Sequence, residues 1–110
     1  MEKPNYYSIL PAEVRYNENL TANEKLLYSE ITALTGKTGE CWATNEYFSK
    51  LYNITIPSIS RMIRHLKENN LIDYVLIKNE ENNTIEKRII TLKCININVK
   101  GVLTNMSRGY

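Results

Sequence analysis

Residues 44–70 read TNEYFSKLYNITIPSISRMIRHLKENN, and this stretch decides the fold. Thr44 is a residue of the kind that caps helices. It precedes an apolar stripe at helical spacing, formed by Tyr47, Phe48 and Leu51. The stripe ends before Asn53, and asparagine tolerates the left-handed backbone with which helices commonly terminate. These features predict a first, short helix.

A second helix follows almost at once. Thr55 is its predicted N-cap, and Pro57 falls in the first turn, where a missing backbone N–H costs nothing. Apolar side chains then recur on one face, namely Ile56, Ile59, Met62, Ile63 and Leu66. Two short helices about four residues apart form a helix-turn-helix. Its second helix, from Ile56 to Asn69, is the one expected to enter the major groove of DNA.

The flanking sequence completes the architecture. Upstream, Thr21 and Glu24 have the spacing of a capping box, which begins another helix. Downstream, the apolar residues 72–77, the polar residues 78–83 and residues 84–92 indicate strand, turn and strand, which is a β-hairpin. A helix-turn-helix followed by a hairpin predicts an α+β fold, the winged helix-turn-helix, with three main helices and a C-terminal β-hairpin wing.

The remaining segments carry weaker signals. Residues 6–10 indicate a strand or extended arm, residues 11–15 one helical turn, and residues 41–43 a short strand that pairs elsewhere in the domain. A length of 110 residues fits one domain. We therefore expect a winged helix-turn-helix DNA-binding domain over residues 1–92, and a linker or the start of a further region over residues 93–110.

Charge is unevenly divided along the chain, although its formal net value is only +2. Residues 1–48 contain four basic and seven acidic side chains, whereas residues 49–110 contain ten basic and five acidic ones. Binding to a polyanion such as DNA favours a positive face of this kind, although a solvated basic face is also common. The asymmetry agrees with DNA binding and does not establish it alone.

The exposed face of the second helix carries the predicted base-reading residues. On a helical wheel Arg61 and Arg64 lie opposite the apolar stripe, with short hydroxyls nearer the N-terminus. A recognition helix presents small polar groups beside the bases and long cations that reach guanine or phosphate. The DNA-binding residues predicted here are Thr55, Ser58, Ser60, Arg61, Arg64, His65 and Lys67. The alternative is a solvated helix face, which the helix-turn-helix context disfavours.

Contacts with the DNA backbone are predicted at two other places. N–H groups at the start of the first helix attract phosphate, although plain capping explains the polar residues there equally well. The hairpin adds cationic and polar side chains, whereas Glu80 and Glu81 at its tip disfavour deep insertion into a groove. The predicted contacts are Thr44, Asn45, Lys78, Asn82, Asn83, Lys87 and Arg88.

Catalytic and metal chemistry have no support in the sequence. With one histidine, His65, and two cysteines, Cys41 and Cys94, neither a nucleophilic arrangement nor a metal-ligand spacing is present. We expect no enzyme activity, no cofactor and no metal. The cysteines are expected to be buried free thiols in a reducing cytoplasm, with a disulfide bridge as the alternative. No apolar run approaches the length of a membrane span.

Much of the chain resembles a known family. The resembling segments are residues 7–16, 20–28, 41–45, 51–55, 58–61 and 66–67, of which Trp42-Ala43-Thr44-Asn45 is the most specific. They are similar to the N-terminal domain of the replication initiators, or replisome organisers, of phages and plasmids from low-GC Gram-positive bacteria. The resemblance implies a winged-helix domain that binds repeated sites in a replication origin. It also implies a C-terminal region, outside this chain, that recruits helicase-loading or replisome proteins.

Other functions and partners stay open at this point. Domains similar to this one also occur in transcriptional regulators, so binding to an operator is the first alternative. A winged helix that binds only other proteins is the second, and Arg61 and Arg64 argue against it, because a protein-binding face would expose apolar residues there. A homodimer is a further possibility, in which Tyr6 and Tyr7 pack on a second copy instead of packing within their own domain.

Overall fold

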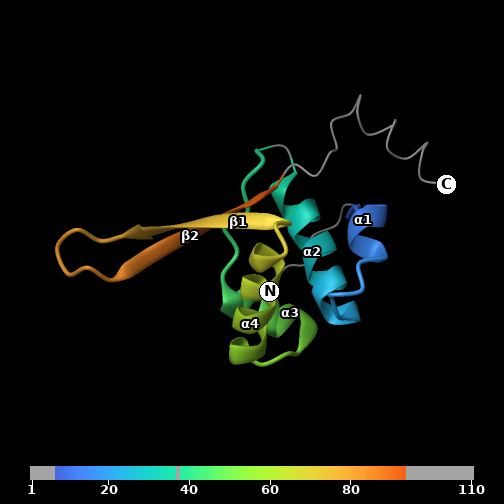
Figure 1. Cartoon of the computed structure of the whole chain (residues 1–110). Helices are drawn as coiled ribbons and strands as arrows, with labels where there is room; N and C mark the ends of the chain where they lie inside the picture. The colour runs from blue at the N-terminus through green and yellow to red at the C-terminus, as the bar shows by residue number, and fades with distance from the viewer. Residues whose placement is uncertain (1–6, 37, 94–110) are drawn as a thin grey trace.

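The computed structural model describes residues 7–36 and 38–93. Its elements follow in the order α1 (Ala12–Arg15), α2 (Ala22–Thr35), α3 (Asn45–Tyr52), α4 (Ile56–Glu68), β1 (Ile72–Lys78) and β2 (Ile85–Leu92). The helices gather into one body, and the β1–β2 hairpin projects away from it as a wing (Figure 1). The expected α+β winged helix-turn-helix is confirmed, with α2, α3 and α4 as its three main helices.

Helix α2 begins where its capping box predicts. The Thr21 hydroxyl accepts a hydrogen bond from the Glu24 backbone N–H at 3.1 Å, and the Glu24 carboxylate accepts one from the Thr21 backbone N–H at 2.9 Å. Each side chain therefore satisfies a backbone donor that has no partner within the helix. The helix ends at Gly36, whose φ of 27° lies in the region that favours glycine.

The turn between α3 and α4 uses the residues that the sequence indicated. Asn53 adopts the left-handed conformation, with φ 58° and ψ 47°. Its backbone N–H and that of Ile54 both return to the Ser49 carbonyl, which satisfies an acceptor at the end of α3. Thr55 then caps α4. Local chemistry at these few residues therefore sets the sharp change of direction between the two helices.

An isolated β-bridge joins the wing to the segment before α3. Strands β1 and β2 pair antiparallel, with a bulge at Ile77 and Lys78. Cys41 exchanges two backbone hydrogen bonds of 2.8 Å with Ile90 of β2, so the short strand expected over residues 41–43 is reduced to one residue. The order across the sheet is Cys41, β2, β1. Within the described residues, β1 is therefore an edge strand.

The core lies between the helices and the inner half of the wing. Its largest fully buried side chains are Phe48, Leu27, Ile31, Ile59, Leu66, Ile72, Ile90, Val14 and Cys41. Phe48 from α3 and Ile59 from α4 are both 0% exposed, so the apolar stripes of the two helices face this core. Helix α4 consequently rests on the body through one face and turns its other face outward.

Two expectations about apolar side chains are wrong. Ile56 was expected in the buried stripe of α4 but is 46% exposed, because it is the first residue of the helix and precedes the first buried residue, Ile59, by almost a turn. Tyr7 is 93% exposed, so it does not pack within its own domain. The arm it belongs to is extended and not a strand, and the Ile9 N–H donates to the Thr32 hydroxyl at 2.7 Å.

Several other expectations fall on residues that are not described. Tyr6, Cys94 and the linker or further region beyond Lys93 lie outside the described residues. Cys41 is a buried free thiol, as expected, and burial raises its pKa. Over residues 7–36 and 38–93, no helix has the length and apolar character needed to cross a membrane.

Candidate nucleic-acid interface

Helix α4 presents two chemically distinct faces. Its buried residues are Ile59, Met62, Ile63 and Leu66. Ser60, Arg61 and Arg64 are exposed on the other side, as the helical wheel predicted. The outward face therefore offers one short hydroxyl and two long cations on a helix whose position is fixed by its buried stripe.

A chain of hydrogen bonds runs along the first turn of α4. The Thr55 hydroxyl accepts from the Ser58 backbone N–H at 3.4 Å and donates to the Ser58 hydroxyl at 3.0 Å. The Ser58 hydroxyl also accepts from the Arg61 guanidinium at 3.0 Å. Arg61 is thus directed toward the N-terminal end of α4, the part of a recognition helix that comes closest to base edges. We refer to these three residues as the Thr55–Ser58–Arg61 series.

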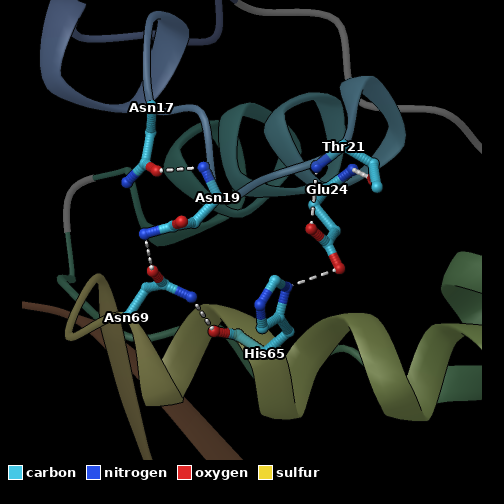
Figure 2. A network of polar contacts seen from close by, with 6 residues as sticks. All are labelled: Asn17, Asn19, Thr21, Glu24, His65 and Asn69. Atoms are coloured by element: carbon cyan, nitrogen blue, oxygen red, sulfur yellow. Dashed lines mark hydrogen bonds and ion pairs between the residues drawn. The ribbon is translucent and has the colours of Figure 1, made fainter.

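His65, one of the predicted base-reading residues, lies at the edge of this outward face and contacts α2, so its DNA contact stays a prediction. Its Nδ1 lies 2.9 Å from Oε2 of Glu24, whose side chain is only 9% exposed (Figure 2). His65 lies at the edge between the two faces of α4, and the capping box places Glu24 directly beside that edge. One carboxylate therefore closes the cap of α2 and holds α4.

Asparagines make a second contact between the same parts of the molecule. The Asn69 side-chain amide donates to the His65 carbonyl at 2.9 Å, and its oxygen accepts from the Asn19 amide at 3.5 Å (Figure 2). The Asn19 backbone N–H donates to the Asn17 side-chain oxygen at 2.8 Å. The loop before α2 and the first turn of α2 are therefore both tied to the C-terminal half of α4, which fixes the orientation of its outward face.

Lys67, another predicted DNA contact, has partners within the domain. Its Nζ lies 3.1 Å from Oδ1 of Asp73 and 5.6 Å from the ring centroid of Tyr74, so it packs against β1. The hydrogen bond from Lys67, followed by that from the Tyr74 backbone N–H, lowers the pKa of the Asp73 carboxyl. Lys67 therefore connects α4 with the base of the wing while staying exposed, and its DNA contact stays a prediction.

Arg88, which was predicted to contact the DNA backbone from the wing, is half-buried and bonded within the domain. One guanidinium nitrogen donates to the Asn45 side-chain oxygen at 2.7 Å, and the other terminal nitrogen donates to the Ala43 carbonyl at 2.9 Å. Arg88 therefore links β2 to the N-terminal end of α3. The Asn45 side-chain oxygen is thus bonded to Arg88; Asn45 was predicted to contact phosphate.

The pleat of β2 explains this orientation. Arg88 shares a face of the strand with Ile90, which is 0% exposed, so its side chain is directed toward the helices and not toward solvent. Burial lowers the pKa of the Arg88 guanidinium, and the neighbouring Cys41 and Tyr74 oppose that shift. Its Nε is buried without a hydrogen-bond partner among the described residues.

The other predicted backbone contacts lie at the surface. Lys78 and Lys87 are exposed on the wing, and the Lys87 ammonium lies 5.4 Å from the ring centroid of Trp42. Asn82 accepts two hydrogen bonds from Thr84, and Asn83 has a left-handed φ of 58°. Both asparagines are therefore explained by the turn that they form. At the start of α3, Thr44 caps the helix by accepting from the Tyr47 N–H at 3.0 Å.

Sequence reasoning missed the residues that orient the interface. Glu24 was recognised only as a capping residue, and its contact with His65 joins positions 41 residues apart, for which the sequence has no local signal. Trp42 was noted as part of a short apolar segment, whereas the structure leaves it 48% exposed beneath Lys87. Trp42 lies within the predicted short strand over residues 41–43, and the sequence does not say which residues lie beside that strand.

The predicted residues along the outward face of α4 are Thr55, Ser58, Ser60, Arg61 and Arg64, with His65 and Lys67 at its edges. A family model described as a helix-turn-helix domain matches residues 18–72, from the loop before α2 to the first residue of β1. The chain belongs to this helix-turn-helix domain family. The match spans the whole helix-turn-helix and supports a DNA-binding domain, and it ends before most of the wing. Comparisons with curated proteins and with solved structures give no match.

Proposed function

We propose that this helix-turn-helix domain binds double-stranded DNA sequence-specifically, with α4 in the major groove. The observation that carries the proposal is the Thr55–Ser58–Arg61 series, which directs a guanidinium toward the N-terminal end of an exposed helix face. A planar guanidinium can bond two acceptors on one guanine, a pairing that contributes about 1–3 kcal/mol of discrimination. Arg64 lies one turn further along, nearer the groove wall, and contacts phosphate.

Phosphate contacts position the domain without reading bases. Lys78 and Lys87 supply them from the wing, together with backbone N–H groups at the start of α3, where Thr44 and Asn45 lie. Polar contacts from Asn82 and Asn83 add to these at the wing tip. If about five phosphates are contacted, the logarithm of affinity falls against the logarithm of salt concentration with a slope of about −4.5.

The test uses the whole chain and duplex DNA. Selection from a random duplex pool identifies the preferred site, and fluorescence anisotropy then measures affinity for that site and for random duplex at several salt concentrations. We expect Arg61→Ala to lower affinity for the selected site about tenfold and to leave random duplex nearly unchanged, with little rescue by Arg61→Lys. Arg64→Ala is the matched control, and we expect it to weaken both.

Two results would contradict this proposal at different levels. Equal losses on selected and random duplex for Arg61→Ala would place Arg61 on the backbone and pass base reading to Ser58 or Ser60. Binding that does not depend on salt would remove the electrostatic contribution on which duplex binding rests, and with it the DNA-binding proposal itself.

We further infer that the sites are repeats in a replication origin, bound in the cytoplasm of a bacterial host by a phage or plasmid initiator. The resemblance to replication initiators supports this inference. The proposed role includes helicase-loading or replisome proteins as partners, which are recruited through a region outside this chain. The proposed role involves no catalytic step. Mapping the selected site onto the genome that encodes the chain is the test. Iterated copies in or beside its own gene are expected, whereas copies only at promoters would favour a transcriptional regulator.

A further inference from the structure

The outer edge of the wing is a β-strand edge with no partner among the described residues. Strand β1 pairs with β2 on one side only, and the Cys41 bridge lies on the far side of β2. The backbone N–H and C=O groups along the other side of β1 are therefore available to another strand. Natural edge strands are usually protected by proline, by charged side chains, by a β-bulge or by being very short. In the wing, the bulge and Lys78 lie only at the outer end of β1, beyond Val75 and Leu76. Strand β1 is seven residues long and contains no proline.

The side chains along this edge are apolar where the wing leaves the helical body. Val75, Leu76 and Ile77 are 61%, 43% and 37% exposed. Because successive side chains of a strand alternate, these three residues expose apolar surface on both faces of the wing. The outer part of the wing extends well beyond the helices, so nothing in the described body covers it (Figure 1). Two charged residues lie at the ends of the strand, Asp73 and Lys78.

We infer that β1 is the docking surface for a second copy of this chain, which pairs with it antiparallel to form a continuous sheet across two wings. A two-fold axis at Leu76 places Leu76 opposite the partner's Leu76. It places Val75 opposite the partner's Ile77 on the other face, and Tyr74 opposite the partner's Lys78. In this register the three exposed apolar side chains of each copy meet apolar side chains of the other, and no like charges face each other.

Charge complementarity also favours a second copy as the occupant. In this register the acidic tip of one wing, Glu80 and Glu81, lies beside the base of the other wing. Two lysines lie at that base: Lys67 next to Asp73, and Lys93, whose backbone N–H donates to the Leu71 carbonyl. The wing tip thus brings two carboxylates to a base with two ammonium groups and one carboxylate. The acidic tip, which disfavours insertion into DNA, has a matching surface on the same molecule.

The arrangement leaves both copies able to present α4. A two-fold axis perpendicular to the sheet keeps the helical layers of both copies on the same side of the joined sheet. Antiparallel wings place the two helical bodies at opposite ends, so the helices do not collide. The dimer interface goes beyond the proposed DNA function and does not depend on it. If both hold, the two recognition helices are related by two-fold symmetry, which suits an inverted repeat.

Sedimentation equilibrium of the whole chain tests this proposal. We expect a monomer–dimer equilibrium in the micromolar range, with a limiting mass twice the 12.8 kDa of one chain. Leu76→Glu places two carboxylates directly opposite each other on the axis, and we expect it to weaken dimerisation at least about tenfold. The matched control is Ile85→Glu, which introduces the same charge at a 57% exposed wing position on β2, away from the β1 edge.

A crosslink tests the register independently of stability. In a Cys94→Ser background, Leu76→Cys brings two thiols opposite each other at a spacing that a disulfide spans, and we expect a covalent dimer under mild oxidation. Ile85→Cys serves as the control and should remain monomeric under those conditions. Circular dichroism checks that each variant is folded, and affinity of the Leu76→Glu monomer for a single selected duplex site reports separately on DNA binding.

Each alternative occupant of the edge gives a distinct contradictory result. A chain that stays monomeric at all concentrations would overturn the proposal and leave the edge to residues 94–110 or to a different protein. Equal loss of dimer in Leu76→Glu and Ile85→Glu, or equal crosslinking by both cysteine variants, would place the contact elsewhere on the wing. Loss of duplex binding with the dimer intact would contradict only the proposed function.

Discussion

The helix-turn-helix and the wing are consecutive in the chain, yet they are stabilised in opposite ways. In the helix-turn-helix, each helix start has a threonine cap and the central side chains Phe48 and Ile59 are 0% exposed. In the outer wing, Val75 and Ile85 are 61% and 57% exposed, and pairing between the two strands is the main support. The first region is complete within the domain, whereas the second presents surface that a partner can cover.

The largest effect is expected when one substitution in the core is compared with one in the wing. We expect Phe48→Ala to lower the free energy of unfolding by about 3–5 kcal/mol, because it leaves a cavity between α3 and α4. Ile85→Ala removes an exposed side chain and should change it by no more than about 0.5 kcal/mol. Urea denaturation followed by circular dichroism measures both. Similar losses would show that the outer wing is as tightly packed as the core.

A smaller effect is expected at the joint between the two regions. Arg88→Ala removes the donors to Asn45 and Ala43, and leaving such partly buried acceptors unpaired costs about 1–3 kcal/mol. Arg88→Lys should recover only part of the loss, because an ammonium lacks the planar fork that reaches both acceptors. Lys87→Ala, one residue away and exposed, is the control and should leave unfolding nearly unchanged. Equal stability of both alanine variants would remove Arg88 as the link.

The smallest effect expected is a loss of stability of the helical body at high pH, through ionisation of Tyr28. Burial, helped by the negative charge of Glu13, raises the pKa of Tyr28 to about 12, against an ordinary value near 10. Between these values the unfolded chain has lost the phenolic proton while the folded chain keeps it. The free energy of unfolding therefore falls as pH rises from about 10 to about 12, by roughly 1 kcal/mol over the first pH unit.

Chemical denaturation across that pH range, with and without Tyr28→Phe, measures this effect. The phenylalanine variant cannot ionise, so its stability should depend less steeply on pH. An identical pH dependence in the two proteins would show that Tyr28 is ionised as readily in the folded chain as in the unfolded one, and that the body is not closed around it.

The sequence was sufficient wherever structure is set by neighbouring residues. Thr21 and Glu24 predicted the start of α2, Asn53 predicted the left-handed turn, and Thr55 predicted the start of α4. These features depend on hydrogen bonds within a few residues, so their signal is local. The same holds for the alternation between buried and outward residues on α4, which identified Arg61 and Arg64 as outward-facing.

What the sequence did not predict are contacts between distant parts of the chain. His65, Lys67 and Arg88 were assigned to DNA because they are cationic or polar on amphipathic elements. Their actual partners, Glu24, Asp73 and Asn45, come from other elements. A wheel or an alternation pattern gives the face on which a residue lies, but not what lies opposite that face. Partners within the domain are therefore hardest to predict for residues at the edge between two faces.

The carboxylate of Glu24 has a consequence for how the domain folds. A first helical turn is costly to form because several dihedral angles are fixed for one hydrogen bond. Here the group that closes the first turn of α2 also bonds to His65 of α4. Nucleation of one helix and docking of the other therefore reinforce each other. We therefore expect the outward face of α4 to lose its orientation when α2 unfolds.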